Sequence, residues 1–497
     1  MRKSGSAHTG WRRSGMQGGY GSGDGDRKDR GHREPRVLPA DRTDSAGGGS
    51  MVSSGDGRGG NAAERRMELA RAWERTLAEV RRLPGFRDFL APPGLDVLTA
   101  AASAGPVAVL TVSRWRCFAL VVRPEGVEAV AYPGLTLTAV VQRANDYLKT
   151  LQQVEHAKDE ADRALCAFAE NPGPSVIRRR KAAVRALLDA HDARERTLRS
   201  LLAWLWDEIA EPVLSALGEA SGSPAEDDTK SPWTRLWWCP TGPLTFLPLH
   251  AAGHHDAPAV RGADTVLDRV ISSYTPTLRA LERARARTPA AAKVRAAPGD
   301  GEGRMLVVAL PDSPGQVSLE SAAHDRDLLA ELFPDERHTL LQGPDATRAA
   351  VLRELRRSPW AHFSCHGTQN LVAPSTGGFL LHDGVLSVED IGAGSYPGSF
   401  AFLSACKTAT GGTGLPDEVI TLAAALHYTG YRHVIATLWS VRDDDAATFS
   451  SDVYRRLCHG GTFDPDRSAH AVHEATRNLR SATDDLSAWT PFTHTGP

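Results

Sequence analysis

Residues 361–367 read Ala-His-Phe-Ser-Cys-His-Gly, and residues 400–408 read Phe-Ala-Phe-Leu-Ser-Ala-Cys-Lys-Thr. Each run predicts a buried β-strand that gives way to loop at a reactive side chain, His366 in the first and Cys406 in the second. Gly367 lets the backbone turn sharply and leaves its own N–H uncovered. If the two strands are neighbours in one parallel sheet, His366 and Cys406 face each other across the same edge of it.

Strands and helices alternate on both sides of these runs. The pattern predicts strands at 304–310, 338–341, 359–364, 378–381, 399–404 and 432–438, and helices at 319–332, 347–356, 418–429 and 444–457. Further upstream, LWWC (236–239) predicts a strand and LTFLPL (244–249) a second extended segment. Such alternation is typical of an α/β fold with a mostly parallel sheet flanked by helices.

The rest of the chain divides by composition. Residues 1–60 hold 16 of the 46 glycines and almost no aliphatic side chains, which predicts a disordered tail. Helical periodicity and three short apolar runs predict a helical and β-meander regulatory region over 61–200. The α/β block then occupies 201–497, with a polar linker at about 285–303.

Besides a disordered tail, two other interpretations of residues 1–60 stay open. This segment carries a mild positive charge, so it could be a nucleic-acid-binding arm. Translation starting at Met16 or Met51 would instead make part of it an artefact of the gene sequence.

Composition excludes several classes of protein. The chain has 58 basic and 60 acidic residues and a net charge of -2, so nothing attracts it as a whole to nucleic acid or anionic lipid. It contains no secretory signal and no apolar run of membrane-spanning length, which predicts a cytoplasmic protein. Its six cysteines form no CxxC pair, so neither a disulfide framework nor a zinc ribbon is expected.

A cysteine and a histidine at neighbouring strand ends suit nucleophilic catalysis. The Cys406 thiolate would attack a carbonyl carbon, and His366 would take the thiol proton. The backbone N–H groups of Gly367 and Cys406 would stabilise the oxyanion. The alternative from the residues alone is that Cys406 is a small buried apolar group and His366 a hydrogen-bonded polar one.

The segments around His366 and Cys406 resemble the HFxCHG and LSACxT motifs of the CHAT-domain family, caspase-like cysteine peptidases of the separase and caspase clan. Further blocks resemble the family in the same order: 239–253, 267–285, 346–367, 417–447 and 488–496. The resemblance implies a caspase-like fold with His366 as general base and Cys406 as nucleophile. Two features depart from the pattern: Lys407 follows the cysteine, and no tetratricopeptide array is visible.

Three consecutive acids, Asp443, Asp444 and Asp445, follow the strand at 432–438 and could form a pocket for a basic P1 side chain. The alternative is that they begin a helix, where carboxylates are favourable. A zinc site of His366, Cys406 and His382 lacks a fourth ligand, and GGTG (411–414) lacks the Lys-Ser/Thr of a P-loop. No metal or cofactor is therefore expected.

The sequence thus predicts a cysteine endopeptidase that an activating signal switches on. A non-catalytic CHAT-fold scaffold and a thiol acyltransferase or hydrolase of another substrate class are the alternatives. By the resemblance, the expected partners are a protein substrate, such as a gasdermin-like pore former in bacterial defence or programmed cell death, and a regulatory protein. Neither nucleic acid nor a membrane is an expected partner.

Overall fold

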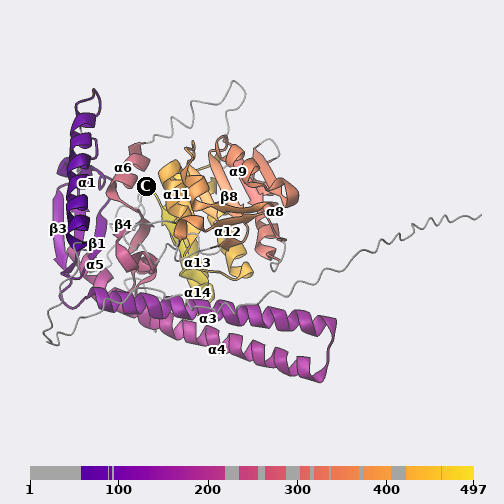
Figure 1. The fold of residues 1–497 in the computed structure, drawn as a ribbon. Coiled ribbons are helices and arrows are strands. Elements are labelled where there is room, and N and C mark those ends of the chain that lie inside the picture. The colour runs from indigo at the N-terminus through magenta and orange to yellow at the C-terminus, as the bar shows by residue number, and fades with distance from the viewer. Residues whose placement is uncertain are drawn as a thin grey trace, which may run out of the picture. The chain divides into compact units, whose positions relative to one another are not determined.

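The computed structural model describes residues 58–87, 89–91, 94–218, 234–255, 264–286, 303–313, 318–334, 337–368, 373–404, 421–459 and 462–497 (Figure 1). All of them belong to one compact unit within Val37–Pro497. The predicted tail lies outside these residues except for 58–60, where helix α1 begins, and most of the predicted linker at 285–303 lies outside them too. In this described part of the chain, no helix combines the length and the apolarity needed to cross a bilayer.

An 11-stranded sheet organises the fold, in the order β3-β2-β1-β4-β5-β16-β13-β12-β8-β6-β7. Its first five strands by sequence are β1 (Val107–Val112), β2 (Cys117–Arg123), β3 (Gly126–Ala131), β4 (Thr234–Pro240) and β5 (Val270–Tyr274). The others are β6 (Met305–Ala309), β7 (His338–Gln342), β8 (Trp360–Ser364), β12 (Phe400–Leu403), β13 (His433–Thr437) and β16 (Phe492–Thr495). Since β1 pairs with β4, the meander upstream of residue 200 and the downstream block share this sheet.

Apart from the antiparallel edge strands β2 and β3, the sheet consists of two parallel blocks that run in opposite directions. The strands β1, β4, β5 and β16 are parallel to one another, as are β13, β12, β8, β6 and β7. The blocks meet where β16 pairs antiparallel with β13. The predicted α/β fold with a mostly parallel, helix-flanked sheet is confirmed.

Helices cover both faces of the sheet around β8. The helices of the block are α6 (Leu278–Ala286), α8 (Glu320–Leu332), α9 (Arg348–Leu355), α10 (Val388–Gly392), α11 (Leu422–Thr429), α12 (Asp443–Leu457), α13 (Ser468–Ala482) and α14 (Leu486–Trp489). Trp360 of β8 packs in a core with residues of α8, α12 and α13, whereas its neighbour Ala361 packs in a second core with residues of α9, α10 and α11. This alternation is what a strand between two helical layers requires.

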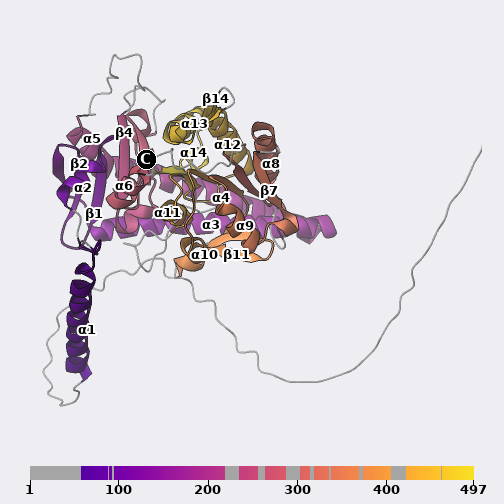
Figure 2. The same ribbon diagram turned by 90° about the horizontal axis from the view of Figure 1, so that it is seen from above.

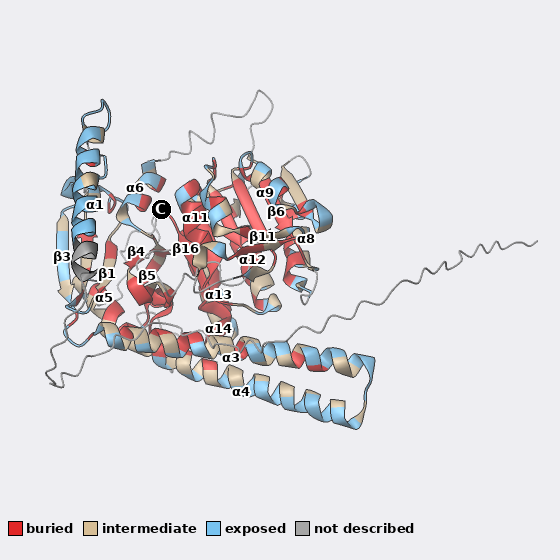
Figure 3. Cartoon of the chain, in the orientation of Figure 1, coloured by how far each residue is buried: buried red, intermediate tan, exposed pale blue. Residues whose placement is uncertain are grey.

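A long helical hairpin dominates the upstream region (Figures 1 and 2). The upstream helices are α1 (Arg58–Arg81), α2 (Leu95–Ala100), α3 (Leu137–Glu170), α4 (Pro174–Leu205) and α5 (Glu211–Ala216), with a π turn at Trp206–Ala210 between the last two. Thr136 caps α3 by accepting the Ala139 N–H, and Pro174 stands in the first turn of α4. Figure 3 shows burial concentrated in the sheet, while the end of the hairpin far from it is mostly exposed.

One local prediction is corrected, and one predicted strand is found in a separate sheet. The segment 244–249 is not extended: it forms 3-10 turns at Gly242–Phe246 and Leu249–Ala251, because Gly242 adopts a φ of 58° and prolines 243 and 248 restrict the chain. The predicted strand at 378–381 exists as β10 (Gly378–Leu381) but belongs to a separate sheet, between β9 (Gly367–Thr368) and β11 (Gly384–Ser387). A further small sheet pairs β14 (Cys458–His459) with β15 (Thr462–Phe463).

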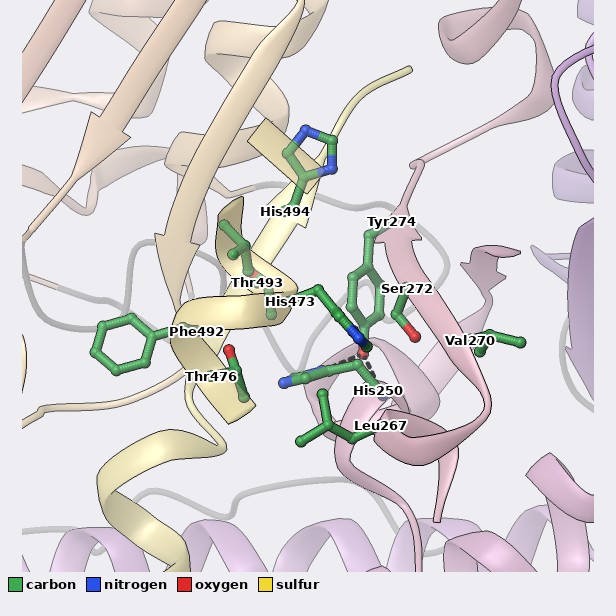
Figure 4. A pocket seen from close by; sticks show the side chains of 11 residues that line it. His250, Leu267, Val270, Ser272, Tyr274, His473, Thr476, Phe492, Thr493 and His494 are labelled. Atoms are coloured by element: carbon green, nitrogen blue, oxygen red, sulfur yellow. Dashed lines mark hydrogen bonds between the residues drawn. The ribbon is translucent and has the colours of Figure 1, made fainter. Parts of the chain in front are cut away.

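Buried histidines line a small cavity of about 20 Å³ between β5, β16 and α13, with room for about one water molecule (Figure 4). His250 lies within hydrogen-bond distance of the Tyr274 hydroxyl, at 2.8 Å from Nδ1, and of the Thr490 carbonyl, at 3.0 Å from Nε2. Burial lowers the pKa of His250 to about 4 and the pKa of His473 to about 3. Both imidazoles are therefore neutral in the folded protein at neutral pH.

We expect the protein to lose stability on mild acidification. In the unfolded chain these histidines bind protons as the pH falls below about 6.5, whereas in the folded chain they do so only near their lowered pKa values. The free energy of unfolding then falls between about pH 6.5 and 4, by at most roughly 1.4 kcal/mol for each unit of pKa difference. Thermal unfolding followed between pH 7 and 5 measures this.

A matched variant identifies the groups responsible. The pKa values of Asp268 and Asp325 lie below the usual range, so these carboxyls weaken the fold only below about pH 4, outside this window. The change His250→Gln should make the pH dependence shallower. An unfolding temperature that does not fall between pH 7 and 5 would contradict the expectation.

Candidate functional site

The two strand ends that carry the reactive residues are adjacent. β8 and β12 pair in parallel, with Trp360 opposite Phe400 and Phe363 opposite Leu403. The Ser404 N–H donates to the Phe363 carbonyl at 2.8 Å, which continues the pairing beyond the last residue of β12. The condition that these two strands are neighbours in one parallel sheet is therefore met.

His366 follows Phe363 by three residues, and Cys406 follows Leu403 by three residues. His366 is partly exposed, and its carbonyl accepts the Leu380 N–H at 2.8 Å, which ties the end of β8 to the small sheet. Cys406 lies outside the described residues, as do Lys407 and the predicted glycine-rich segment after it. The roles of His366 and Cys406 stay predictions.

Gly367 begins β9 and lies opposite Phe379 of β10. The bond from the Leu380 N–H to the His366 carbonyl flanks this pair. In an antiparallel ladder, hydrogen-bonded pairs alternate with pairs whose backbone groups do not bond to each other, and Gly367 and Phe379 form a pair of the second kind. The Gly367 N–H therefore points away from β10.

A buried polar cluster lies beneath the end of β8. Asp325 of α8 is fully buried, and its Oδ2 lies 3.1 Å from His362 Nε2 and accepts the Ser364 hydroxyl at 2.9 Å. Its Oδ1 accepts the Ser450 hydroxyl of α12 at 2.6 Å. The other ring nitrogen of His362, Nδ1, lies 2.9 Å from the hydroxyl of Tyr454, also on α12.

The cluster stabilises the charged form of its carboxyl. Burial alone would raise the pKa of Asp325, but the attraction to His362 and the hydrogen bonds from His362, Ser450 and Ser364 hold that pKa below its usual range. The sequence predictions missed Asp325 and His362. The available signal was a second histidine, four residues before His366, inside a strand whose other residues before Ser364 are apolar.

The three acids after β13 lie in the first turn of α12, as the helix alternative described. Asp443 accepts the Glu320 N–H at 3.1 Å and the Ser321 hydroxyl at 2.9 Å, so it caps the start of α8. Asp445 is buried and accepts two bonds from Arg442, at 2.7 and 3.2 Å. Asp444 is exposed.

The upstream hairpin reaches the loop between β13 and α12. Tyr147 of α3 packs edge-on against Trp439, with ring centroids 5.4 Å apart, and Glu155 of α3 accepts the Ser440 hydroxyl at 3.2 Å. From α4, the Glu195 carboxylate accepts the backbone N–H of Leu486 at 2.9 Å, at the start of α14. Among the described residues, no cluster of His, Cys, Asp or Glu could hold a metal ion.

The chain resembles a known protein family and solved structures of one protein complex. The sequence model of the CHAT domain family matches residues 199–497. One crystal structure of the Saccharomyces cerevisiae separase–securin complex aligns at a TM-score of 0.52 and 10% identity, over 80% of this chain, and another at 0.48 and 9%, over 81%. The chain spans only 30% of the length of either matched chain, and no curated protein sequence matches it.

Proposed function

Because this chain belongs to the CHAT-domain family of caspase-like cysteine peptidases, we propose that it is a cysteine endopeptidase in which Cys406 is the nucleophile and His366 the general base. One observation carries the proposal. Phe363 and Leu403 lie opposite each other on neighbouring parallel strands, and His366 and Cys406 each follow their strand's member of this pair by three residues. In such sheets the reactive groups gather beyond the carboxyl ends of the strands.

The reaction would proceed in two steps. The Cys406 thiolate attacks the scissile carbonyl carbon, and the amine leaves with a proton from His366, which produces a thioester. A water that gives its proton to His366 then attacks the thioester and releases the new carboxylate together with the thiol. The N–H groups of Gly367 and Cys406 would hold the oxyanion in both steps.

The assignment is tested by labelling the intact protein with a peptide that carries a thiol-reactive electrophile. Modification that depends on Cys406 and on His366 supports a peptidase. A protein that binds partners but shows no such labelling and no cleavage is the scaffold alternative. Acyl transfer to an acceptor other than water would identify the thiol acyltransferase instead, and product analysis distinguishes it.

We also propose that residues 61–200 form a regulatory region and that residues 201–497 form the peptidase domain that it regulates. The contacts of Tyr147 and Glu155 with the 439–440 loop support the idea, since this loop follows β13, the strand next to β12. Separase is seen with securin in the matched structures, and we propose a regulatory protein partner here as well. A dedicated protein substrate, such as a gasdermin-like protein, and a cytoplasmic location complete the proposal.

For the substrate, we propose a basic P1 residue recognised by the acids at 443–445. Internal bonds occupy Asp443 and Asp445, whereas Asp444 is exposed, so Asp444→Asn should reduce cleavage after Arg or Lys. An exposed ion pair contributes at most about 1 kcal/mol, which limits the loss to about five-fold. Profiling of a peptide library measures it, with the exposed Asp192→Asn as control. An apolar P1 preference would refute the pocket.

A further inference from the structure

We propose that Asp325 is a positioning residue for the catalytic base: through Ser364 and His362 it holds the end of β8 in the place that His366 needs. This inference rests on the proposed function, because it assigns a purpose to a cluster next to the dyad. The residues of the cluster come from three elements, α8, β8 and α12, and only β8 leads to His366.

The first argument is the cost of the buried charge. Asp325, His362 and Ser364 are all fully buried. Removing a carboxylate from water costs several kcal/mol even after relaxation, and well-packed apolar side chains of similar volume are often neutral or stabilising replacements. Packing alone therefore does not require an acid here, whereas a directional set of hydrogen bonds does.

The second argument is where the bonds lead. Ser364 is the last residue of β8 and lies two residues before His366. Its hydroxyl donates to Asp325, while its carbonyl accepts the Leu310 N–H of the neighbouring strand segment at 2.9 Å. The strand end is thus held both along the sheet and perpendicular to it. On the other side, the Phe363 carbonyl accepts the Ser404 N–H, which links the same point to the strand that precedes Cys406.

The third argument is how Asp325 is itself held in place. The Ser450 hydroxyl donates to Asp325 Oδ1, and the Tyr454 hydroxyl lies within hydrogen-bond distance of His362 Nδ1. Helix α12 therefore holds both Asp325 and His362 in place. Asp443, in the first turn of α12, caps α8 and so joins the two helices that flank the cluster. A group held from two helices can transmit a fixed position to β8. Side chains locked in this way hold catalytic groups to within about half an ångström.

The test measures the reactivity of Cys406 in the full-length protein. Alkylation by iodoacetamide is followed from pH 5 to 9, and each cysteine peptide is quantified by mass spectrometry. Cys166 is exposed and serves as the internal standard. An imidazole in place near the thiol stabilises the thiolate, so Cys406 should react at lower pH than Cys166.

The variants are Asp325→Asn, Ser364→Ala and His366→Ala. Asp325→Asn and Ser364→Ala should both move the Cys406 profile toward that of His366→Ala, with about a ten-fold loss of rate at low pH for each unit by which the thiol pKa rises. Ser364→Ala keeps the buried charge and removes one hydroxyl, so it remains informative if Asp325→Asn does not fold.

Ser273→Ala is the matched control. Ser273 of β5 is equally buried and hydrogen-bonded, to Arg235 of β4 and His494 of β16. Its Cys406 profile should stay that of the unmodified protein even if its stability falls. Unmoved profiles in Asp325→Asn and Ser364→Ala, or an equal shift in Ser273→Ala, would overturn the positioning role. A Cys406 profile identical to that of Cys166 before any substitution would instead refute the proposed dyad.

Discussion

Replacement of Cys406 by alanine is expected to abolish peptide cleavage. The thiolate forms the covalent intermediate, so its removal leaves only binding and the oxyanion donors. The loss of kcat expected when a covalent nucleophile is removed is on the order of 10⁶-fold. The measurement is the turnover of a peptide library by the purified protein and by the variant.

The control for Cys406→Ala is the other cysteine of the two motifs. Cys365 is almost fully buried in the core formed with α9, α10 and α11, on the opposite face of β8 from the Asp325 cluster. Cys365→Ala should therefore cleave at a rate within a few-fold of the unmodified protein, at some cost in stability. Undiminished turnover in Cys406→Ala would rule out the peptidase assignment and favour the scaffold.

Replacement of His366 by alanine is expected to cost nearly as much. Without the base, the thiol is not deprotonated at neutral pH and the leaving amine receives no proton. Residues that act as one unit show non-additive losses, so the double variant Cys406→Ala with His366→Ala should be no slower than either single variant. Rates for the two single variants and the double variant measure this coupling.

An exposed histidine provides the control for His366→Ala. His382 lies next to β10 and is exposed, and its replacement by alanine should leave turnover unchanged. A further drop in the double variant, by a factor comparable to the first, would show that the two residues act independently. That outcome would contradict a dyad.

Much of the fold near the site could be predicted from the sequence, because the strands there are short apolar runs. In addition, β8, β12 and β13 lie side by side in the large sheet in the order in which they occur in the chain. Phe400–Leu403 pairs with Trp360–Ser364, and the predicted strand at 399–404 differs from β12 by only one residue at each end. Once the two strands pair in parallel, their carboxyl ends lie at the same edge of the sheet. The local pattern and the tertiary structure agree here.

The reversal of strand direction could not be predicted in this way. β16 inserts between β5 and β13 near the end of the chain, and its partner β5 lies more than 200 residues earlier. β5 reads Val-Ile-Ser-Ser-Tyr, a short and half-polar run that gives a weak strand signal. Only contacts that are distant in sequence specify this pairing.

The Asp325 cluster escaped prediction for a related reason. Asp325 belongs to a helix in which charged residues are frequent, so its side chain is not distinguishable by type from those facing solvent. Its partner His362 is 37 residues away, and Ser450 is 125 residues away. The burial that makes the acid notable exists only once α8, β8 and α12 have packed together.

The most direct test of the central claim is the identity of the cysteine that a peptidyl electrophile modifies in the intact protein. Cys406 should carry the label, and His366→Ala should lose it, while iodoacetamide continues to modify the exposed Cys166 in both proteins. Equal labelling of Cys406 with and without His366, or a label on another cysteine, would contradict the account.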